Sequence, residues 1–495
     1  MSIDAIAPQV PPIRIDVRVD VPERPDGDYV LYWMTMFRRR RSNFALQRAV
    51  EWAARLDRPL IVLEALRCGY PYASDRLHAF ILEGMGDNAR AFADGAATYF
   101  PYVEPEPGAG KQLLATLAKR ACVVVGDEFP TFMLPRMTAA AGRQIDARFE
   151  LVDANGLLPM RAAPKEFLVA VDFRRFLQRE LPKHLVQFPR FDPLADVALP
   201  RLAELPKELD RWPRASDALL EARPEALARL PIDHAVGRGV MRGGAVAGAE
   251  RLATFLGEKL GRYPDLRLDP MAEVTSRLSP YLHFGHVSSH EVVAALAQKE
   301  GWTPGRLSTT VSGKREGWWG MSAPAEAFLD EIVTWRELSY NLCFRRPDDH
   351  WTIAAVPEWA RRTLAEHAND PKPHRYTAEE FEAGRTHDAL WNAAHAQLVR
   401  DGWFHNRMRM LWAKKILEWS ADPAEALRTM GTLMNKYALC GRNPNASSGY
   451  LWTLGRYDRP WGPVRPVLGT VRFLSTDLAA KKPEMRAFME RYAPR

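Results

Sequence analysis

Hydrophobic and polar positions divide the chain into two halves with different periodicities. In the first half, short uninterrupted apolar runs lie between segments in which apolar residues recur every three to four positions. Such runs are typical of strands buried on both faces of a sheet, and the recurring spacing is typical of amphipathic helices. The runs predict strands at 29–33, 60–63, 122–125 and 149–152, and the spacing predicts helices at 43–56, 75–94, 110–119 and 131–142.

Strands that alternate with helices predict an open, Rossmann-like α/β domain whose parallel sheet is covered on both faces. We assign this domain to residues 28–180, after a flexible lead-in over residues 1–27 that is rich in Pro and Asp. The domain contains neither GxGxxG nor a P-loop, so no phosphate-binding motif reveals a ligand for it.

The second half predicts a different architecture. Prolines recur through residues 181–244, which we interpret as a long connection that wraps the surface. Residues 245–495 show helical spacing almost throughout and predict an all-α domain. Asp422, Pro423 and Glu425 form a helix-start pattern, and we expect Gly441 to end that helix.

Size and cysteine content limit the class of protein. A chain of 495 residues and 56.1 kDa is long enough for two or more domains. No apolar stretch reaches the length of a membrane span, and the N-terminus lacks the pattern of a secretory signal. The four cysteines lie far apart without a CxxC pair, which argues against a zinc site or a disulfide framework. Separated cysteines fit a reducing compartment, so we expect a cytoplasmic protein. We also expect a monomer.

The net charge of +7 and the pI of about 9.2 are compatible with a polyanionic partner such as DNA, although many soluble proteins are mildly basic. The run Arg38–Arg41 leads directly into a predicted helix. It fits a nucleic-acid-binding arm, and it fits a solvated helix start at least as well.

Three further patterns each allow a functional and a structural interpretation. Thr275–Ser279 places hydroxyls before a predicted helix, where they would hold a pyrophosphate or cap the helix, and spacing alone favours the cap. Glu331 and Trp335 share a helical face and suit either the binding of a nucleobase or a surface carboxylate beside a core ring. Cys440–Asn445 is a turn that, by itself, is best interpreted as a plain loop.

Tryptophan is abundant, with 15 residues that concentrate after position 300. Trp412 and Trp419 are seven apart and share one helical face, and Trp391 lies on a separate predicted helix. Spacing of this kind usually means core packing, but it also suits a chain of redox-active rings.

Taken together and in order, five segments resemble the flavin domain of the photolyase/cryptochrome family, and more narrowly class II cyclobutane pyrimidine dimer photolyases. They are SRLSPYLHFG, FLDEIVTWREL, DALWNAAHAQLV, MRMLWAKKILEW and KYALCGRNPN. In the first half, Tyr32–Met34, Asn43–Leu46 and Val152–Asn155 match as well. The resemblance covers most of the chain, and MRMLWAKKILEW is its most specific segment.

The resemblance implies an α/β antenna domain joined to an all-helical domain that holds FAD. It implies a carbon–carbon lyase that uses blue or near-UV light to split pyrimidine dimers, which are flipped out of UV-damaged DNA because they cannot be reached inside the stack. It also implies an optional antenna chromophore of deazaflavin type, whose pocket we cannot identify from the sequence.

Roles carried over by position are implied by the resemblance alone. The FAD phosphates would be held by Tyr263, Thr275, Ser276, Arg277, Leu278 and Ser279. The flavin ring would lie near Arg409, Gly441 and Asn445. Glu331 would hydrogen-bond the dimer, with Trp335 and Trp452 stacked against it and Met410 beside it. Electrons would reach the flavin through Trp412, Trp391 and Trp419, with Tyr376 as the terminal donor.

The chain departs from the class around the flavin. An Asn that faces flavin N5 and the Asp after it are here Met434 and Asn435, and two further Asp positions are Cys440 and Asn443. A thioether makes no strong hydrogen bond, and Arg409 without its Asp partner favours an anionic flavin. We therefore predict oxidised and anionic flavin with little neutral radical. A register shift of one residue would put Asn435 at N5 instead, and both registers stay open.

These departures motivate an alternative function, a cryptochrome-like blue-light sensor that has lost repair. Against it, the chain has no long polar tail after the flavin domain. The retained Glu331, Trp335, Trp452 and Met410 favour repair.

Overall fold

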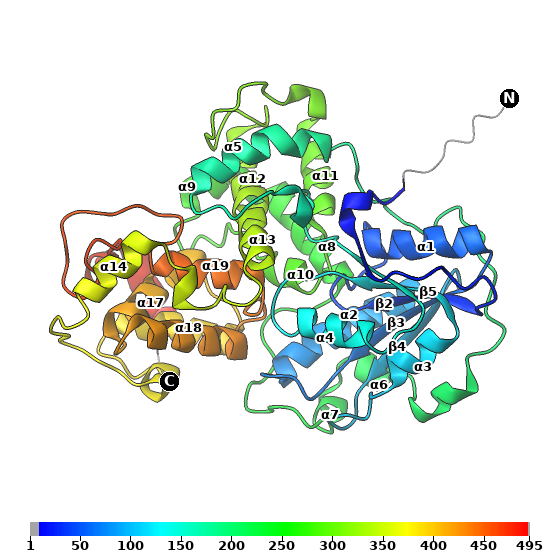
Figure 1. Ribbon diagram of the computed structural model, residues 1–495. Helices are drawn as coiled ribbons and strands as arrows, with labels where there is room; N and C mark the ends of the chain where they lie inside the picture. Colours follow the sequence, from blue (N-terminus) through cyan, green and yellow to red (C-terminus); the bar gives the residue numbers. More distant parts are fainter. Residues whose placement is uncertain (1–8, 494–495) are drawn as a thin grey trace.

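The computed structural model describes residues 9–493, and its first part is built on a six-stranded sheet (Figure 1). The strand order is β1-β6-β5-β2-β3-β4, in which β1 is antiparallel to β6 and all other neighbours are parallel. The strands are β1 (Ile15–Val19), β2 (Tyr29–Met34), β3 (Leu60–Leu66), β4 (Thr98–Val103), β5 (Ala121–Asp127) and β6 (Arg148–Val152).

Helices cover both faces of this sheet, which explains why its central strands are continuous apolar runs. Leu31 and Trp33 of β2 belong to the cluster that includes α3, whereas Val30 and Tyr32 belong to the cluster that includes α1. The helices of this part are α1 (Phe44–Leu56), α2 (Asp75–Ala91), α3 (Leu113–Lys119) and α4 (Leu134–Gly142). The predicted α/β fold is confirmed.

Two strands were not predicted. β1 lies inside the expected flexible lead-in, where it pairs with β6, so residues 15–19 are part of the sheet. Residues 1–8 of the lead-in lie outside the described residues. β4 contains Pro101, which argues against a central strand, and it lies at the edge of the sheet, where a missing N–H is tolerated.

The arginine run before α1 has a structural role that neither interpretation of the sequence foresaw. Arg38 pairs with the buried Glu64 at 2.9 Å, and Arg39 donates to the carbonyl of Gly285 at 2.8 Å. Both arginines are buried, so neither a nucleic-acid arm nor a solvated helix start describes them.

The remainder of the chain is helical (Figure 1). α5 (Ala170–Glu180) lies at the end of the range that we assigned to the α/β domain, and it packs against the helical part. The connection over 181–244 contains α6 (Asp217–Leu220) and α7 (Pro224–Leu227), which lie against α2. The helices that follow are α8 (Ala245–Thr254), α9 (Tyr263–Leu266), α10 (Ser279–His283), α11 (Ser289–Glu300), α12 (Ala323–Leu329), the π-helical turn η8 (Asp330–Trp335), α13 (Arg336–Arg345), α14 (Glu358–Glu366), α15 (Ala378–Glu382), α16 (Ala389–Asp401), α17 (Asn406–Trp419), α18 (Pro423–Tyr437), α19 (Pro444–Thr453), α20 (Thr476–Ala480) and α21 (Pro483–Arg491).

The predicted start of α18 is confirmed, because the Asp422 side chain accepts from two backbone N–H groups of the first turn. The predicted stop at Gly441 is wrong. α18 ends at Tyr437, since Ala438 already has an extended backbone. Gly441 lies in the turn beyond the helix, where a Cβ atom would come within 2.1 Å of the Met434 carbonyl oxygen.

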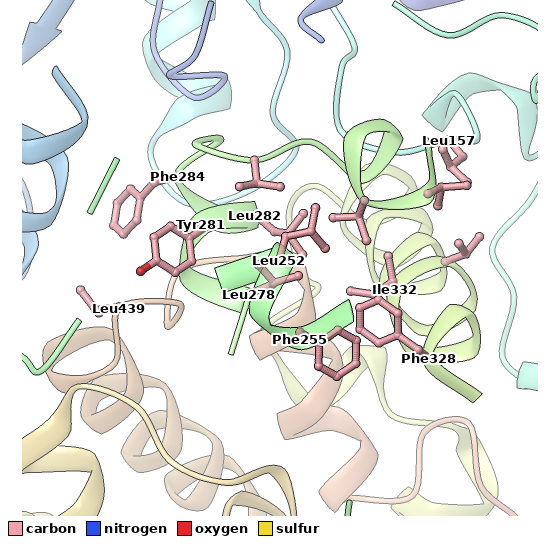
Figure 2. Packing of buried hydrophobic residues seen from close by; sticks show 14 of the residues in the cluster. Leu157, Leu252, Phe255, Leu278, Tyr281, Leu282, Phe284, Phe328, Ile332 and Leu439 are labelled. Atoms are coloured by element: carbon pink, nitrogen blue, oxygen red, sulfur yellow. The ribbon is translucent and has the colours of Figure 1, made fainter. Parts of the chain in front are cut away.

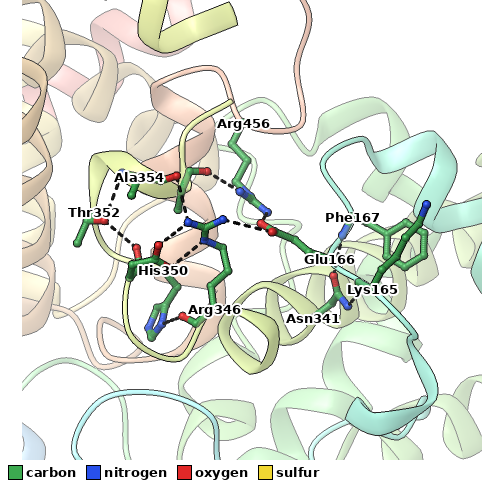
Figure 3. Close-up of polar contacts among 11 residues, drawn as sticks. Lys165, Glu166, Phe167, Asn341, Arg346, His350, Thr352, Ala354 and Arg456 are labelled. Carbon is green, nitrogen blue, oxygen red and sulfur yellow. Dashed lines mark hydrogen bonds and ion pairs between the residues drawn. The ribbon is translucent and has the colours of Figure 1, made fainter. Parts of the chain in front are cut away.

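The two parts share one apolar core. Figure 2 shows this cluster, in which α10 residues such as Tyr281 and Leu282 lie among α8, α12 and η8 side chains. Phe80 of α2 contacts the rings of Tyr281 and Phe284 at 5.3 and 5.4 Å. Polar contacts add to the junction, since Glu166 before α5 pairs with Arg346 at 3.3 Å and also with Arg456 (Figure 3). In residues 9–493 no helix is both long enough and apolar enough to cross a lipid bilayer.

Candidate functional site

Four aromatic rings form an unbroken chain from the interior to the surface. Trp412 and Trp391 stack at a centroid distance of 6.1 Å, Trp391 contacts Trp419 at 6.3 Å, and Trp419 contacts Tyr376 at 5.7 Å. The three indoles are at most 4% exposed, whereas Tyr376 is half-buried. The indole N–H of Trp391 donates to the Trp412 carbonyl at 3.0 Å, which fixes the stack. The structure thus brings together all four residues of the expected electron path.

Arg409 lies beside the inner end of this chain, three positions before Trp412 on α17. Its guanidinium approaches the Cys440 sulfur at 3.6 Å, and its buried Nε has no hydrogen-bond partner among residues 9–493. The hydroxyl of Tyr450 is also buried without a partner, and burial raises its pKa while Arg409 opposes the rise. A thiol is a weak hydrogen-bond acceptor. The Arg409 guanidinium and the Tyr450 hydroxyl therefore keep N–H and O–H donors available for an acceptor on a ligand.

The residues expected around the flavin N5 have different surroundings. Met434 is fully buried in the apolar cluster that also contains Trp412, and Asn435 is half-exposed at the end of α18. Asn445 is half-exposed in the first turn of α19. The structure therefore places the Met434 side chain in the core and leaves the Asn435 side chain outside it.

The segment before α10 presents polar groups that do not cap the helix. α10 has no side-chain capping bond, and the Ser276 hydroxyl accepts only a local bond from the Leu278 N–H at 3.4 Å. Leu278 itself is buried in the apolar cluster (Figure 2). Arg277 lies 4.6 Å over the Trp403 ring. Four side chains of this segment are half-exposed, namely Thr275, Ser276, Arg277 and Ser279.

Glu331 lies on the π-helical turn η8, one turn before Trp335. Turns of this kind are frequent at functional sites. Its carboxylate pairs with Arg267 at 3.2 Å, and its side chain is 37% exposed. Burial among the surrounding elements raises the pKa of Glu331, and Arg267 opposes the rise. Arg267 also lies 5.9 Å from the ring of Tyr263, which packs against Phe255 and Phe328.

The two expected stacking rings are both half-buried. Trp335 meets the Tyr457 ring edge-on at 6.2 Å. Trp452 lies 5.0 Å from the amine of the buried Lys414, which donates to the Thr453 carbonyl at 2.6 Å. Met410, also half-buried, follows Arg409 on α17.

Sequence reasoning missed several polar residues near these groups. Arg267 follows Tyr263 by four positions, a helical spacing that would have been a usable signal. His405 caps α17 and has a buried Nε2 without a partner, and burial lowers its pKa to about 4. Nothing in its sequence neighbourhood distinguishes His405 from an ordinary capping residue.

A cavity of about 480 Å³ opens at the carboxyl ends of β2, β3, β4 and β5. It lies where the chain order of the strands reverses, which is the usual ligand position in open α/β sheets. Its walls include the aromatic and thioether side chains of Trp33, Met36, Tyr70, Phe129 and Met137. The helical part closes one side with His283, Phe284 and Arg442.

Comparison with known proteins gives these features a context. No family model matches the chain. The deoxyribodipyrimidine photo-lyase of Methanothermobacter thermautotrophicus is 31% identical over 473 residues, which are 95% of this chain and 96% of that protein. The protein belongs to the photolyase/cryptochrome family.

Other members agree with this assignment. The deoxyribodipyrimidine photo-lyase of Oryza sativa subsp. japonica is 32% identical over 94% of this chain and 87% of its own length. The crystal structure of a class III photolyase from Agrobacterium tumefaciens has the same fold, with a TM-score of 0.64 and 16% identity over 96% of this chain and 88% of that chain. A cryptochrome from Synechocystis sp. PCC6803 gives a TM-score of 0.62 at 14% identity, covering 94% and 89% of the two chains.

The family binds FAD, and the residues of this photolyase homologue suit that cofactor. The buried donors of Arg409 and Tyr450 lack acceptors, and a flavin ring carries several carbonyl and imine acceptors. The hydroxyls of Thr275 and Ser276 and the guanidinium of Arg277 suit a pyrophosphate. The donor set therefore fits FAD.

Proposed function

We propose that this photolyase homologue binds FAD in its helical half and repairs cyclobutane pyrimidine dimers in DNA, in the manner of a class II enzyme. One observation carries the proposal, namely the unbroken chain of rings from Trp412 to Tyr376. Aromatic rings at contact distance supply a route for single electrons between a buried cofactor and the surface. FAD, when bound, supplies light absorption and one-electron transfer.

The chain's own residues have distinct tasks in this proposal. Arg409 and Tyr450 would orient the flavin ring, and Arg277 would hold the phosphates with the hydroxyls of Thr275 and Ser276. Because positive charge near the ring favours its anionic forms, an Arg409 without a carboxylate partner supports reduced, anionic flavin. Either Met434 or Asn435 would face the flavin ring, and both registers stay predictions.

The choice of repair over light sensing rests on Glu331 and the rings near it. Burial raises the pKa of the Glu331 carboxyl and so favours its protonated form, which can donate a hydrogen bond to a base carbonyl. Trp335 and Trp452 would stack on the flipped dimer, and Met410 would lie beside it. Arg459, Arg465 and Arg472 surround the Trp461 and Phe473 rings and would contact DNA phosphates.

Repair of a dimer-containing oligonucleotide under blue light tests this proposal. We expect the reduced, FAD-loaded protein to restore the bases, and we expect Glu331→Ala to lower the rate by about 10-fold or more, since a lost hydrogen bond to a charged group costs about 1.5–3 kcal/mol. Glu490→Ala, an exposed change on α21, is the matched control and should repair at the unaltered rate. A loaded protein that absorbs light but repairs nothing at any flavin redox state would favour the cryptochrome-like sensor.

We also propose that the cavity at the sheet edge holds an antenna chromophore of deazaflavin type. Its aromatic and thioether walls suit a flat, largely apolar ring system. We expect Ala140→Trp, which points a large ring into the cavity lining, to abolish binding of an added deazaflavin in a fluorescence titration. Ala139→Trp, its exposed neighbour outside the lining, should bind as the unaltered protein does. Equal binding by both variants would place the chromophore elsewhere.

A further inference from the structure

Tyr376, the outermost ring of the relay, makes two hydrogen bonds with a single residue. Its hydroxyl lies 2.7 Å from Nδ1 of His387 and accepts the backbone N–H of the same residue at 2.9 Å. The backbone N–H takes up one lone pair of the phenol oxygen, and the heavy-atom positions fit either direction of the shorter bond. When Nδ1 carries no proton, the phenol is the donor and the imidazole the acceptor.

In that arrangement His387 is neutral and carries its proton on Nε2. Partial burial and the stacked ring of His374, at 3.5 Å, lower the pKa of His387 below its usual value. Lys415 of α17 acts in the same direction, whereas Asp388, which caps α16, and Asp477 of α20 oppose it. These groups leave His387 unprotonated at neutral pH and ready to take up a proton.

Loss of an electron turns a phenol into a strong acid, so its proton leaves wherever a base is in contact. The base in contact with Tyr376 is His387, and the ring in contact on the inner side is Trp419, at 5.7 Å. The backbone N–H of Tyr376 also donates to the Trp419 carbonyl at 3.2 Å. This hydrogen bond fixes Tyr376, the terminal electron donor, beside Trp419. The electron and the proton of Tyr376 thus have separate neighbours, and the rings of these two neighbours also contact each other at 4.9 Å.

We propose that His387 is the proton acceptor for Tyr376 when the relay is oxidised. One electron passes from Tyr376 to the Trp419 ring that has lost an electron, and the O–H proton passes to Nδ1 of His387. The products are neutral Trp419, a neutral tyrosyl radical and an imidazolium ion. The oxidant that first removes the electron from the relay is the light-excited flavin, so the inference rests on the proposed function.

The position of His387 makes the step effective. His387 is exposed, so its imidazolium can release a proton to water. Once that proton has left, the radical can recover an electron only by taking a proton back. The oxidised residue is then Tyr376 at the surface, at the other end of the chain of rings from Arg409. The return of the electron to the oxidised relay is therefore slowed.

Flash photolysis of the FAD-loaded protein tests the proposal through the identity of the radical. We expect a neutral tyrosyl radical by electron paramagnetic resonance and transient absorption, with slower formation in D2O than in H2O. His387→Gln keeps a hydrogen-bond acceptor but cannot bind a proton at neutral pH. We expect it to slow tyrosyl formation by about 10-fold or more, on the scale of lost general-base assistance, and to leave the hole on tryptophan.

Two further variants and the pH profile sharpen this test. Tyr376→Phe should give no tyrosyl radical, and His374→Gln, which removes the stacked neighbour but not the acceptor, should form it within about twofold of the unaltered rate, since the proton acceptor is kept. The rate should fall at acidic pH, where Nδ1 of His387 is already protonated, and should be independent of pH in His387→Gln. Equal rates in His387→Gln and the unaltered protein, without a solvent isotope effect, would overturn the proposal.

A measurement without the cofactor separates this proposal from the proposed function. In flavin-free protein with ¹⁵N-labelled histidine, we expect the Nδ1 signal of His387 to be that of an unprotonated, hydrogen-bonded nitrogen and to shift in Tyr376→Phe. A protonated Nδ1 at neutral pH would overturn the inference even if the protein repaired DNA. If the protein took up no FAD, the proposed function would fail while this signal still reported on the pair.

Discussion

Lys414 is a buried amine next to a ring that we place against the DNA lesion. It is 1% exposed, it donates to the Thr453 carbonyl, and burial lowers its pKa from 10.5 to about 7. In the unfolded chain the amine stays protonated up to about 10.5, so between pH 7 and 10.5 the unfolded state binds more protons. Stability from this residue therefore rises with pH across that window and is constant below it.

We expect this dependence to disappear in Lys414→Met. Between pH 7 and 9 the unaltered protein should gain about 2 kcal/mol in free energy of unfolding relative to the variant, since each pH unit contributes up to about 1.4 kcal/mol. Urea unfolding at both pH values measures the difference. The exposed Lys481→Met is the control and should follow the unaltered protein, and a pH-independent gap for Lys414→Met would contradict the expectation.

At the scale of single residues, the sequence predicted the four rings that the structure brings into contact, but not the partners of Glu331 and Tyr376. The four relay residues were predicted and lie in contact. Partners such as Arg267 and His387 were not, because they meet Glu331 and Tyr376 through tertiary contacts, and only the spacing of Arg267 from Tyr263 offered a signal. Their roles, like those of the residues predicted around the flavin, stay predictions.

At the scale of elements, the turn between α18 and α19 depends on Gly441. A Cβ atom there would lie 2.1 Å from the Met434 carbonyl oxygen, so Gly441→Ala must displace backbone. We expect a loss of about 2 kcal/mol or more, on the scale of overpacked cores, together with weaker FAD binding because Cys440 moves relative to Arg409. Denaturant unfolding and a flavin titration measure the two effects.

Gly431 on α18 is the matched control. No heavy atom lies within 4 Å of a Cβ atom built there, so Gly431→Ala should stabilise the helix by up to about 1 kcal/mol. Equal effects of the two substitutions would show that close backbone approach is not what requires Gly441.

Element prediction succeeded where one physical signal dominated. The buried strands and the amphipathic α1 followed from apolar periodicity alone, and the start of α18 followed from its cap. It failed at β1 and β4, which lie at the sheet edges. There Asp16 and Arg18 mimic a solvated segment, and Pro101 mimics a break in the strand.

At the scale of the whole molecule, Arg76 links the α/β part to the helical part through hydrogen bonds. From α2 it donates to the carbonyls of Gly237, Val399 and Tyr437 at 3.0, 2.7 and 2.8 Å, and it is 4% exposed. Arg76→Met would remove the donor from these partly buried carbonyls. We expect a loss of about 2 kcal/mol or more, because a hydrogen bond to a charged group contributes about 1.5–3 kcal/mol.

We expect the same variant to unfold in two steps instead of one, with protease cutting first in the connection over 181–244. The control Arg90→Met lies on the same helix, where its exposed side chain pairs with Asp87 at 2.5 Å, and it should change stability by at most about 1 kcal/mol. A single cooperative transition in Arg76→Met, at unaltered stability, would mean that the shared apolar core alone joins the two parts.

The wall that the helical part contributes to the sheet-edge cavity has a consequence for biosynthesis. Phe284 and Arg442 lie in the lining, yet Arg442 is synthesised more than four hundred residues after Trp33, which lines the same cavity. A nascent chain that has emerged only as far as α5 therefore carries an unfinished pocket. A chromophore would bind there only after nearly the whole chain has been translated. Its presence in the purified protein would therefore show that the two parts had packed against each other.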